Sequence, residues 1–291
     1  MESNSGSFLK KRICIVTDLD GTLLNSESEF PEKNRNTLQN FLNHDHIIIF
    51  ATGRRFHSTS RYAAELKGNV YLVCNNGQVT GVCGEKKEIW DTNFLDSEMS
   101  RTASEIGKSR GLSPILHTGM FEEGIDMCME SGKGSEAYVH NNKDRIFFSE
   151  SHHDFPFARG LVLCFLSKDM NTLKSLDREI TDSLSEHSFR TVLTTINRVG
   201  PCLEILPKET SKWSGVRSIL KKIQSHDIPV ISFGDESNDI ELIENSHIGI
   251  APSNAVEPVK RIADRVSHLS NNEEFIHYEL EKILSSAALF M

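Results

Sequence analysis

The chain lacks long hydrophobic runs. No apolar stretch among its 291 residues approaches the ~18 residues that a transmembrane helix requires. The N-terminal segment, residues 1–11, has two lysines but no apolar core of the ~7–15 residues found in secretory signals. We therefore expect a short polar tail, no leader and no membrane association.

The cysteines lack the spacing of a metal site. The six cysteines are scattered, without a Cys-x-x-Cys pair and without a zinc-type spacing to histidine. Several lie inside apolar runs, where a free cysteine behaves as a small hydrophobic residue. We therefore expect no disulfides and a location in the reducing cytoplasm.

An excess of positive charge is also missing. The net charge is -9 and the isoelectric point is near 5.8, which argues against nucleic acid as the main partner. A local basic pocket for a single phosphate is compatible with this charge. With 38% hydrophobic and 25% charged residues, the chain has the composition of a globular protein of one large or two smaller domains.

Apolar strands alternate with amphipathic helices in two parts of the sequence. In the first part we expect strands at 12–17, 46–52 and 70–74, and helices at 31–43 and 55–66. In the second part we expect strands at 229–233 and 247–251, and helices at 213–222, 238–244 and 273–284. Uninterrupted apolar strands that alternate with helices indicate an α/β fold whose parallel, Rossmann-like sheet is covered on both faces.

The segment between these two parts has a different character. Short strands at 146–149 and 161–166 mix there with helices at 96–110 and 170–185 and with polar loops. The simplest interpretation is a core formed by residues 1–81 and 200–291, interrupted by an inserted α+β domain at 82–199.

Two carboxylates, Asp18 and Asp20, follow the first strand at a glycine turn. Two like charges side by side in a buried place are costly unless a cation lies between them or a pKa is raised. The pair therefore favours a catalytic site, although Asp-x-Asp-Gly alone also fits a calcium loop or a plain turn after a strand.

Other polar residues follow the remaining core strands. They are Thr52, Gly53 and Arg54 after the second strand, Gly234, Asp235, Asn238 and Asp239 after 229–233, and Lys212 before a helix. Ligands of open α/β sheets bind at the carboxyl ends of the strands. Four converging carboxylates favour a hard divalent cation such as Mg²⁺, while Thr52 and Lys212 suit phosphate oxygens. This combination predicts phosphoryl transfer through an aspartyl phosphate.

The motifs resemble those of a known family. Asp-Leu-Asp-Gly-Thr at 18–22, Ala-Thr-Gly-Arg at 51–54, Ser-Lys at 211–212 and Gly-Asp-Glu-Ser-Asn-Asp at 234–239 are similar, in order, to the four motifs of the haloacid dehalogenase superfamily. The large insert, with Ala-Pro-Ser-Asn-Ala at 251–255, resembles the Cof-type phosphatases, whose insert is an α/β cap.

The resemblance implies a role for each matching residue. Asp18 corresponds to the nucleophile, and Asp20 to the general acid that protonates the leaving alcohol and then activates water. Mg²⁺ is implied at Asp18, the backbone carbonyl of Asp20 and Asp235, with Asp239 orienting the ligands.

The phosphate-binding set is implied in the same way. Thr52 and Lys212 correspond to the residues that hold the phosphoryl group, and Asn238 helps the phosphate or the metal ligands. Gly53 belongs to the turn that presents Thr52. Arg54 either orients substrate or forms a salt bridge to the core. Asn76 either contacts ligand or supports its turn.

Some features leave questions of specificity open. Trp213 follows Lys212 where many relatives have glycine, and Glu236 follows Asp235 where they have asparagine. Charged residues of the insert are candidates for substrate recognition: Lys143, Arg145, Arg190 and Arg198. The segment His152-His153-Asp154 suggests a metal site. Consecutive histidines in a strand point opposite ways and rarely bind one ion, so we interpret the segment as a solvated loop.

These observations favour a Mg²⁺-dependent phosphatase of small phosphorylated metabolites, above all sugar phosphates. The insert is expected to close over the site and exclude water. The alternatives are a phosphomutase and a non-catalytic protein that binds phosphorylated metabolites. The expected protein is a monomer or weak homo-oligomer.

Overall fold

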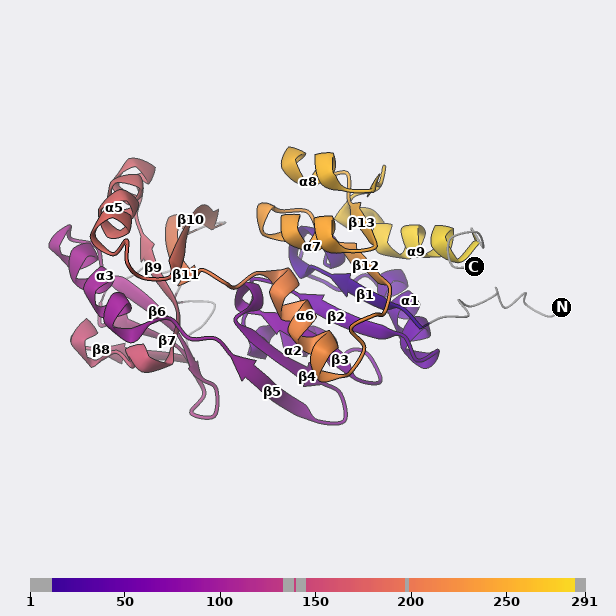
Figure 1. Ribbon diagram of the computed structural model, residues 1–291, viewed down its shortest axis with the longest axis horizontal. Coiled ribbons are helices and arrows are strands. Elements are labelled where there is room, and N and C mark those ends of the chain that lie inside the picture. The colour runs from indigo at the N-terminus through magenta and orange to yellow at the C-terminus, as the bar shows by residue number, and fades with distance from the viewer. Residues whose placement is uncertain (1–11, 133–138, 140–144, 197–198, 286–291) are drawn as a thin grey trace. The chain divides into compact units, whose positions relative to one another are not determined.

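The computed structural model describes residues 12–132, 139, 145–196 and 199–285 (Figure 1). The chain forms two compact units, a core unit of residues up to 91 and from 211 onward, and an inserted unit of residues 92–210. Both boundaries lie C-terminal to the expected ones, at 91/92 rather than 81/82 and at 210/211 rather than 199/200. The reason is that β5 (Lys87–Thr92) joins the core sheet, whereas β11 (Gly200–Pro207) joins the inserted sheet.

The core unit contains an eight-stranded sheet in the order β14-β13-β12-β1-β2-β3-β4-β5. Besides β5, its strands are β1 (Cys14–Thr17), β2 (Ile47–Ala51), β3 (Val70–Cys74), β4 (Val79–Cys83), β12 (Val230–Phe233), β13 (Ile248–Ala251) and β14 (Arg265–Val266). Pairing is parallel from β14 to β3, as the uninterrupted apolar runs predicted. The antiparallel strand β4 was not expected and follows β3 through a turn at Asn75–Gly77.

The register of the central strands brings their carboxyl ends to one edge. Thr17, the last residue of β1, pairs with Phe233 of β12 on one side and with Phe50 of β2 on the other. β1 is fully buried between these neighbours. The residues that follow each strand therefore leave the sheet at the same level.

Helices cover both faces of the core sheet. They are α1 (Glu32–Asn43), α2 (Phe56–Ala63), α6 (Lys212–Lys222), α7 (Ile240–Asn245), α8 (Glu257–Ile262) and α9 (Phe275–Ser285). Val216 of α6 and Leu242 of α7 pack in one apolar cluster with Val16 and Ile49. Phe275 of α9 contacts Phe233 edge to face, at a ring separation of 5.7 Å, and α9 also contacts α1.

The inserted unit is an α+β structure of its own. Its six-stranded sheet has the order β10-β11-β9-β6-β7-β8. Its elements besides β11 are α3 (Ser97–Ser109), β6 (Pro114–Met120), β7 (Ile125–Glu130), β8 (Ile146–Ser149), β9 (Gly160–Leu166), α5 (Met170–Ser183) and β10 (Phe189–Ile196). Met99 of α3 and Leu176 of α5 pack with Leu163 and Phe165 of β9 in a separate apolar cluster. Among the described residues, no helix is long and apolar enough to span a membrane.

Candidate active site

Asp18 lies directly after β1, and its backbone N–H donates to the carbonyl of Phe233 at 3.0 Å. Only 5% of its surface is exposed. Burial raises the pKa of Asp18 well above its usual value, an effect that Lys212 opposes and that Asp239, Asp235 and Asp20 reinforce. The carboxyl group is thus held where ionisation needs a nearby cation.

Lys212 supplies one such cation. It is the first residue of α6 and is 1% exposed, so it is not a solvated surface lysine. Its ammonium nitrogen lies 3.0 Å from Oδ1 of Asp18 and 2.8 Å from Oδ1 of Asp239. Burial acts to lower the pKa of Lys212, but the two carboxylates outweigh it and hold the pKa above its usual value.

Asp235 completes the cluster from the loop after β12. The hydroxyl of Thr22 donates to its Oδ1 at 2.5 Å. Gly21, with φ of +73°, passes so close that a Cβ there would lie 2.3 Å from the Oδ2 of Asp235, so only glycine fits this turn. Burial raises the pKa of Asp235 to about 7, although the bond from Thr22 opposes the shift.

Asp239 is fully buried behind this group. Its Oδ1 accepts from Lys212, and its Oδ2 accepts the backbone N–H groups of Asp235 and Glu236, each at 3.1 Å. Both oxygens are therefore occupied by protein donors. This carboxylate orients Lys212 and the loop of Asp235.

Asp18, Asp235 and Asp239 place one carboxylate oxygen each within 4.8 Å of one another. With Lys212 as the counter-charge in contact with two of them, three ionised carboxylates leave an excess of two negative charges. A divalent cation with oxygen ligands balances this excess. The donor set thus fits Mg²⁺, with Asp18 and Asp235 better placed as direct ligands than Asp239.

Asp20 lies outside this group of carboxylates. Its side chain is 54% exposed and forms a two-pronged ion pair with Arg54, whose Nε and Nη2 donate at 2.6 and 2.5 Å. Arg54 also donates to the hydroxyl of Tyr62 at 3.0 Å and stacks on that ring. Of the two expected roles of Arg54, a salt bridge is observed, and its partner is the predicted acid–base residue.

The predicted phosphate-binding residues form a second group. Thr52 follows β2, is 1% exposed, and its hydroxyl accepts the N–H of Arg54 at 3.1 Å. Asn76 donates its backbone N–H to the carbonyl of Thr52 at 3.1 Å, and its side chain accepts from Asn238 at 2.9 Å. A Cβ at Gly53 would lie 3.3 Å from Oδ1 of Asn76. The structure thus brings together five of the six predicted phosphate-binding residues in this group, and the sixth, Lys212, lies with the carboxylates.

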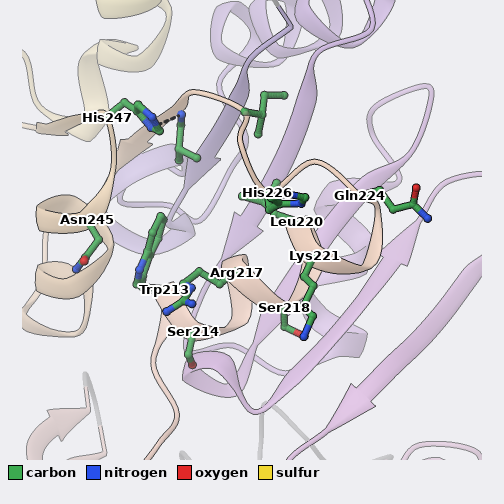
Figure 2. Close-up of a pocket in the computed structure, with 12 residues that line it drawn as sticks. Trp213, Ser214, Arg217, Ser218, Leu220, Lys221, Gln224, His226, Asn245 and His247 are labelled. Atoms are coloured by element: carbon green, nitrogen blue, oxygen red, sulfur yellow. Dashed lines mark hydrogen bonds between the residues drawn. The ribbon is translucent and has the colours of Figure 1, made fainter.

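Trp213 lines a pocket on the core unit between α6 and α7 (Figure 2). The pocket has a volume of about 1150 Å³, and Figure 2 shows Trp213 beside Arg217 and facing Asn245 and His247. No predicted site residue lines it. Trp213 also packs against the apolar cluster of the sheet, which explains the large side chain at this position.

Sequence reasoning missed several supporting residues. Thr22 lies in the quoted Asp-Leu-Asp-Gly-Thr motif but was given no role. Asn254 lies in the Ala-Pro-Ser-Asn-Ala segment, and its amide donates to the carbonyl of Gly21 at 2.8 Å, which secures the turn under Asp235. Tyr62, which holds Arg54, had no signal in the sequence.

The charged residues expected to recognise substrate have different surroundings. Lys143 and Arg198 lie outside the described residues. Arg145 pairs with Asp126 at 2.8 Å, and Arg190 donates to the carbonyl of Thr210 at 3.1 Å. Both described arginines therefore have partners within the inserted unit.

Comparison with known proteins identifies the family. A family model described as haloacid dehalogenase-like hydrolase matches residues 15–280. The chain is 24% identical over 272 residues to 5-amino-6-(5-phospho-D-ribitylamino)uracil phosphatase YitU of Bacillus subtilis strain 168, covering 91% of this chain and 94% of YitU. It is 24% identical over 254 residues to YcsE, a phosphatase of the same description from that bacterium, covering 87% and 88%.

A solved structure supports the same assignment. A haloacid dehalogenase-like hydrolase from Bacteroides thetaiotaomicron has a TM-score of 0.79 to this chain at 25% identity, covering 94% of this chain and all of that one. The resemblance predicted from the motifs is confirmed, as is the α/β fold with its inserted α+β unit. The chain belongs to the haloacid dehalogenase-like hydrolases and is a phosphatase-type enzyme of that family.

Proposed function

We propose that this enzyme is a Mg²⁺-dependent phosphatase of small phosphorylated metabolites, with Asp18 as the nucleophile. The observation that carries the proposal is the contact of buried Asp18 with Lys212 at 3.0 Å, at the sheet edge where Asp235 also lies. A lysine in this place neutralises charge on the carboxylate and on an arriving phosphoryl group.

The proposed reaction has two displacements. An oxygen of Asp18 attacks phosphorus and forms an aspartyl phosphate, while the bond to the leaving alcohol breaks. Asp20, whose exposed carboxylate first takes up a proton from solvent, donates that proton to the alcohol oxygen. Asp20 then accepts a proton from water as the water oxygen attacks phosphorus. This step releases inorganic phosphate and restores the carboxylate of Asp18.

Arg54 and Lys212 position the groups for these steps. The ion pair with Arg54 holds Asp20 in one orientation, and Lys212 together with Thr52 is proposed to hold the phosphoryl oxygens. Asp18, the backbone carbonyl of Asp20 and Asp235 would hold Mg²⁺, which would supply charge neutralisation at the phosphoryl group. Asp239 orients Lys212 and the Asp235 loop.

For the substrate we propose a phosphate monoester on a sugar or polyol. The support is that the relatives YitU and YcsE carry the name of a phosphatase of a phosphoribitylamino-uracil. We also propose that the inserted unit selects the substrate. A monomer or weak homo-oligomer in the cytoplasm is proposed as the working form, where the six free, buried cysteines stay reduced.

The test is phosphate release from a panel of sugar and polyol phosphates, with p-nitrophenyl phosphate as a generic substrate. We expect Mg²⁺-dependent release that falls at least about 1000-fold in Asp18→Asn, as for loss of a nucleophile. Asp227→Asn, an exposed site in the core unit at 93% side-chain exposure, is the matched control and retains full activity. Equal slow rates in wild type and Asp18→Asn contradict the mechanism.

The alternatives give different outcomes in the same assay. Interconversion of sugar-phosphate isomers without net phosphate release identifies a phosphomutase. Tight substrate binding without turnover identifies a binding protein. The exposed Asp20 carboxylate, held by Arg54, favours an enzyme, because pure binding needs no acid–base group.

A further inference from the structure

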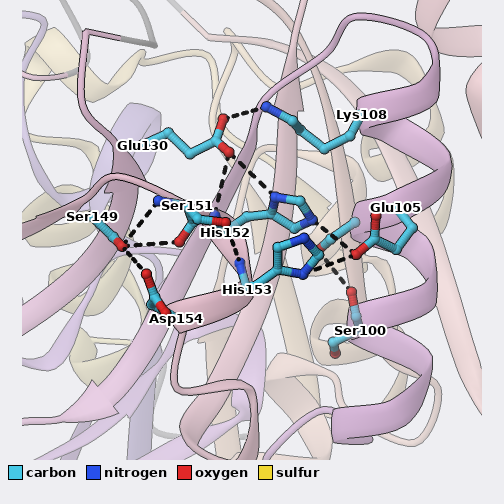
Figure 3. A network of polar contacts seen from close by, with 10 residues as sticks. Ser100, Glu105, Lys108, Glu130, Ser149, Ser151, His152, His153 and Asp154 are labelled. Carbon is cyan, nitrogen blue, oxygen red and sulfur yellow. Dashed lines mark hydrogen bonds and ion pairs between the residues drawn. The ribbon is translucent and has the colours of Figure 1, made fainter.

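A cluster of histidine and glutamate side chains lies within the inserted unit (Figure 3). Glu105 comes from α3, Glu130 ends β7, and His152 and His153 begin the short helical turn His152–Asp154. His152 is 5% exposed, so the expectation of a solvated loop is wrong for this residue. The side chain of His153 is 68% exposed.

The helical turn lets consecutive histidines face the same way. The two rings stack at a centroid separation of 4.3 Å. Nε2 of His152 lies 3.1 Å and Nδ1 of His153 lies 3.2 Å from the same atom, Oε1 of Glu105. In a strand the two side chains would diverge, so the local backbone creates this convergence.

These separations match the geometry of a zinc site. Ligand atoms ~2.0–2.1 Å from Zn²⁺ in a tetrahedral arrangement lie roughly 3.3 Å from one another. The two nitrogens and the Glu105 oxygen lie within 4.8 Å of each other, and two of the three separations are already close to the tetrahedral value. Because the two ring planes are inclined by only 34°, the imidazole rings must rotate about their side-chain bonds to direct all three donors at one ion.

A second carboxylate holds the buried ring. Nδ1 of His152 lies 3.2 Å from Oε1 of Glu130, and Glu130 is itself bonded to Lys108 at 2.6 Å. Although burial acts against it, hydrogen bonds from Lys108, Ser113 and the His152 backbone hold the pKa of Glu130 below its usual value. An ionised carboxylate behind a ligating histidine is the usual support of zinc-binding imidazoles.

The hydrogen-bond partners of the His152 ring favour a bound metal ion. Both ring nitrogens face carboxylate oxygens, yet a neutral imidazole has a single N–H to donate. With Nδ1–H donated to Glu130, the lone pair of Nε2 is directed toward Glu105. A cation between these two atoms satisfies both.

We propose that Glu105, His152 and His153 form a Zn²⁺ site, with Glu130 as the residue that orients His152. The mixed nitrogen and oxygen donors suit Zn²⁺ and disfavour Mg²⁺, which prefers oxygen ligands in octahedral geometry. Because the ligands come from α3 and from the turn His152–Asp154, the metal joins these two segments of the inserted unit. We expect a water molecule as the fourth ligand.

The test is metal titration of the full-length protein with Co²⁺ followed by Zn²⁺, in a buffer that contains excess Mg²⁺. A tetrahedral Co²⁺ site with nitrogen ligands absorbs visible light strongly, unlike an octahedral oxygen site such as the aspartate cluster. We expect an intense visible band at one Co²⁺ per chain, which Zn²⁺ abolishes by displacement.

Ligand variants identify the site. His153→Ala and Glu105→Gln are expected to lose the band and to weaken Zn²⁺ binding more than about 100-fold, and Glu130→Gln by about 10–100-fold. His226→Ala is the matched control, since His226 is 70% exposed and lies 3.2 Å from Asp227, and this pair belongs to no group of three potential ligands among the described residues. It keeps the band and the affinity.

The proposal is overturned if wild type shows no band, if both ligand variants keep it, or if His226→Ala loses it equally. Unfolding curves in the presence of a chelator check the fold, because His153 is exposed and its replacement leaves the metal-free stability unchanged. Phosphate release in Mg²⁺ stays unaffected in every variant, so the result is independent of the proposed function.

Discussion

Replacement of Lys212 by methionine is the sharpest test of the electrostatic argument. Methionine keeps most of the side-chain volume but removes the charge that contacts Asp18 and Asp239 at 3.0 and 2.8 Å. Lys212 is 1% exposed, so water cannot replace the ammonium group. Asp18 and Asp239 then lose the cation that contacts both of them.

The expected cost is large. Removal of one partner from a buried ion pair destabilises a protein by about 3–5 kcal/mol. At roughly 2–4 °C per kcal/mol for a unit of this size, the core unit of Lys212→Met should melt about 6–20 °C lower in metal-free buffer. Mg²⁺ should recover part of this loss, because it neutralises the same carboxylates.

The loss depends on pH. The folded-state pKa values of Asp18 and Asp235 are raised, the latter to about 7. Their contribution to stability is therefore present at low pH and is lost as the pH rises through about 7. Lys212→Met makes ionisation still less favourable, so the difference from wild type should be larger at about pH 8 than at about pH 5.5.

Tryptophan fluorescence is a suitable assay, because both tryptophans, Trp90 and Trp213, belong to the core unit. Melting curves of wild type and Lys212→Met are compared with and without Mg²⁺ at the two pH values. Lys221→Met, an exposed position on the same helix, is the control and should change stability by less than about 0.5 kcal/mol. A Lys212→Met protein as stable as this control at both pH values refutes the reasoning.

Three further predictions concern catalysis. Thr22→Val removes the bond to Asp235 and should raise the Mg²⁺ concentration for half-maximal activity by about 10-fold or more, whereas Thr22→Ser should not. Because protons compete with the metal at Asp235, whose pKa is raised to about 7, this concentration should fall between about pH 6 and pH 8; a flat profile contradicts the assignment. Arg54→Lys keeps the charge but loses the two-pronged bond to Asp20, so kcat should fall about 10-fold with an altered pH profile, and an unchanged kcat contradicts a positioning role.

Most of the core fold was predictable from the sequence because its signals are local. The apolar runs that form β1, β2 and β3 are uninterrupted, and the predicted strand at 70–74 agrees with the observed Val70–Cys74. The unit boundaries were less predictable. Whether a strand such as β5 or β11 joins one sheet or the other depends on which edge is free to pair, and that is not encoded in its own composition.

The candidate site was likewise predictable in part. Polar residues after parallel strands predicted that Asp18 and Asp235 lie at one edge, and the register of β1 with β12 agrees. The burial of Lys212 between two carboxylates and the bond from Thr22 to Asp235, which joins residues 213 positions apart, came from the structure. Such contacts depend on packing between distant segments.

The sequence by itself determined the family, the parallel core, and the carboxylates, lysine and threonine proposed for catalysis, because short motifs and apolar periodicity carry that information. Only the tertiary structure decided the pairing of Asp20 with Arg54 and the convergence of His152 and His153 on Glu105. The physical reason is that side-chain partners are chosen by backbone direction and burial. Burial arises when distant segments meet in the folded chain, whereas the backbone direction at His152 and His153 is set by their own helical turn.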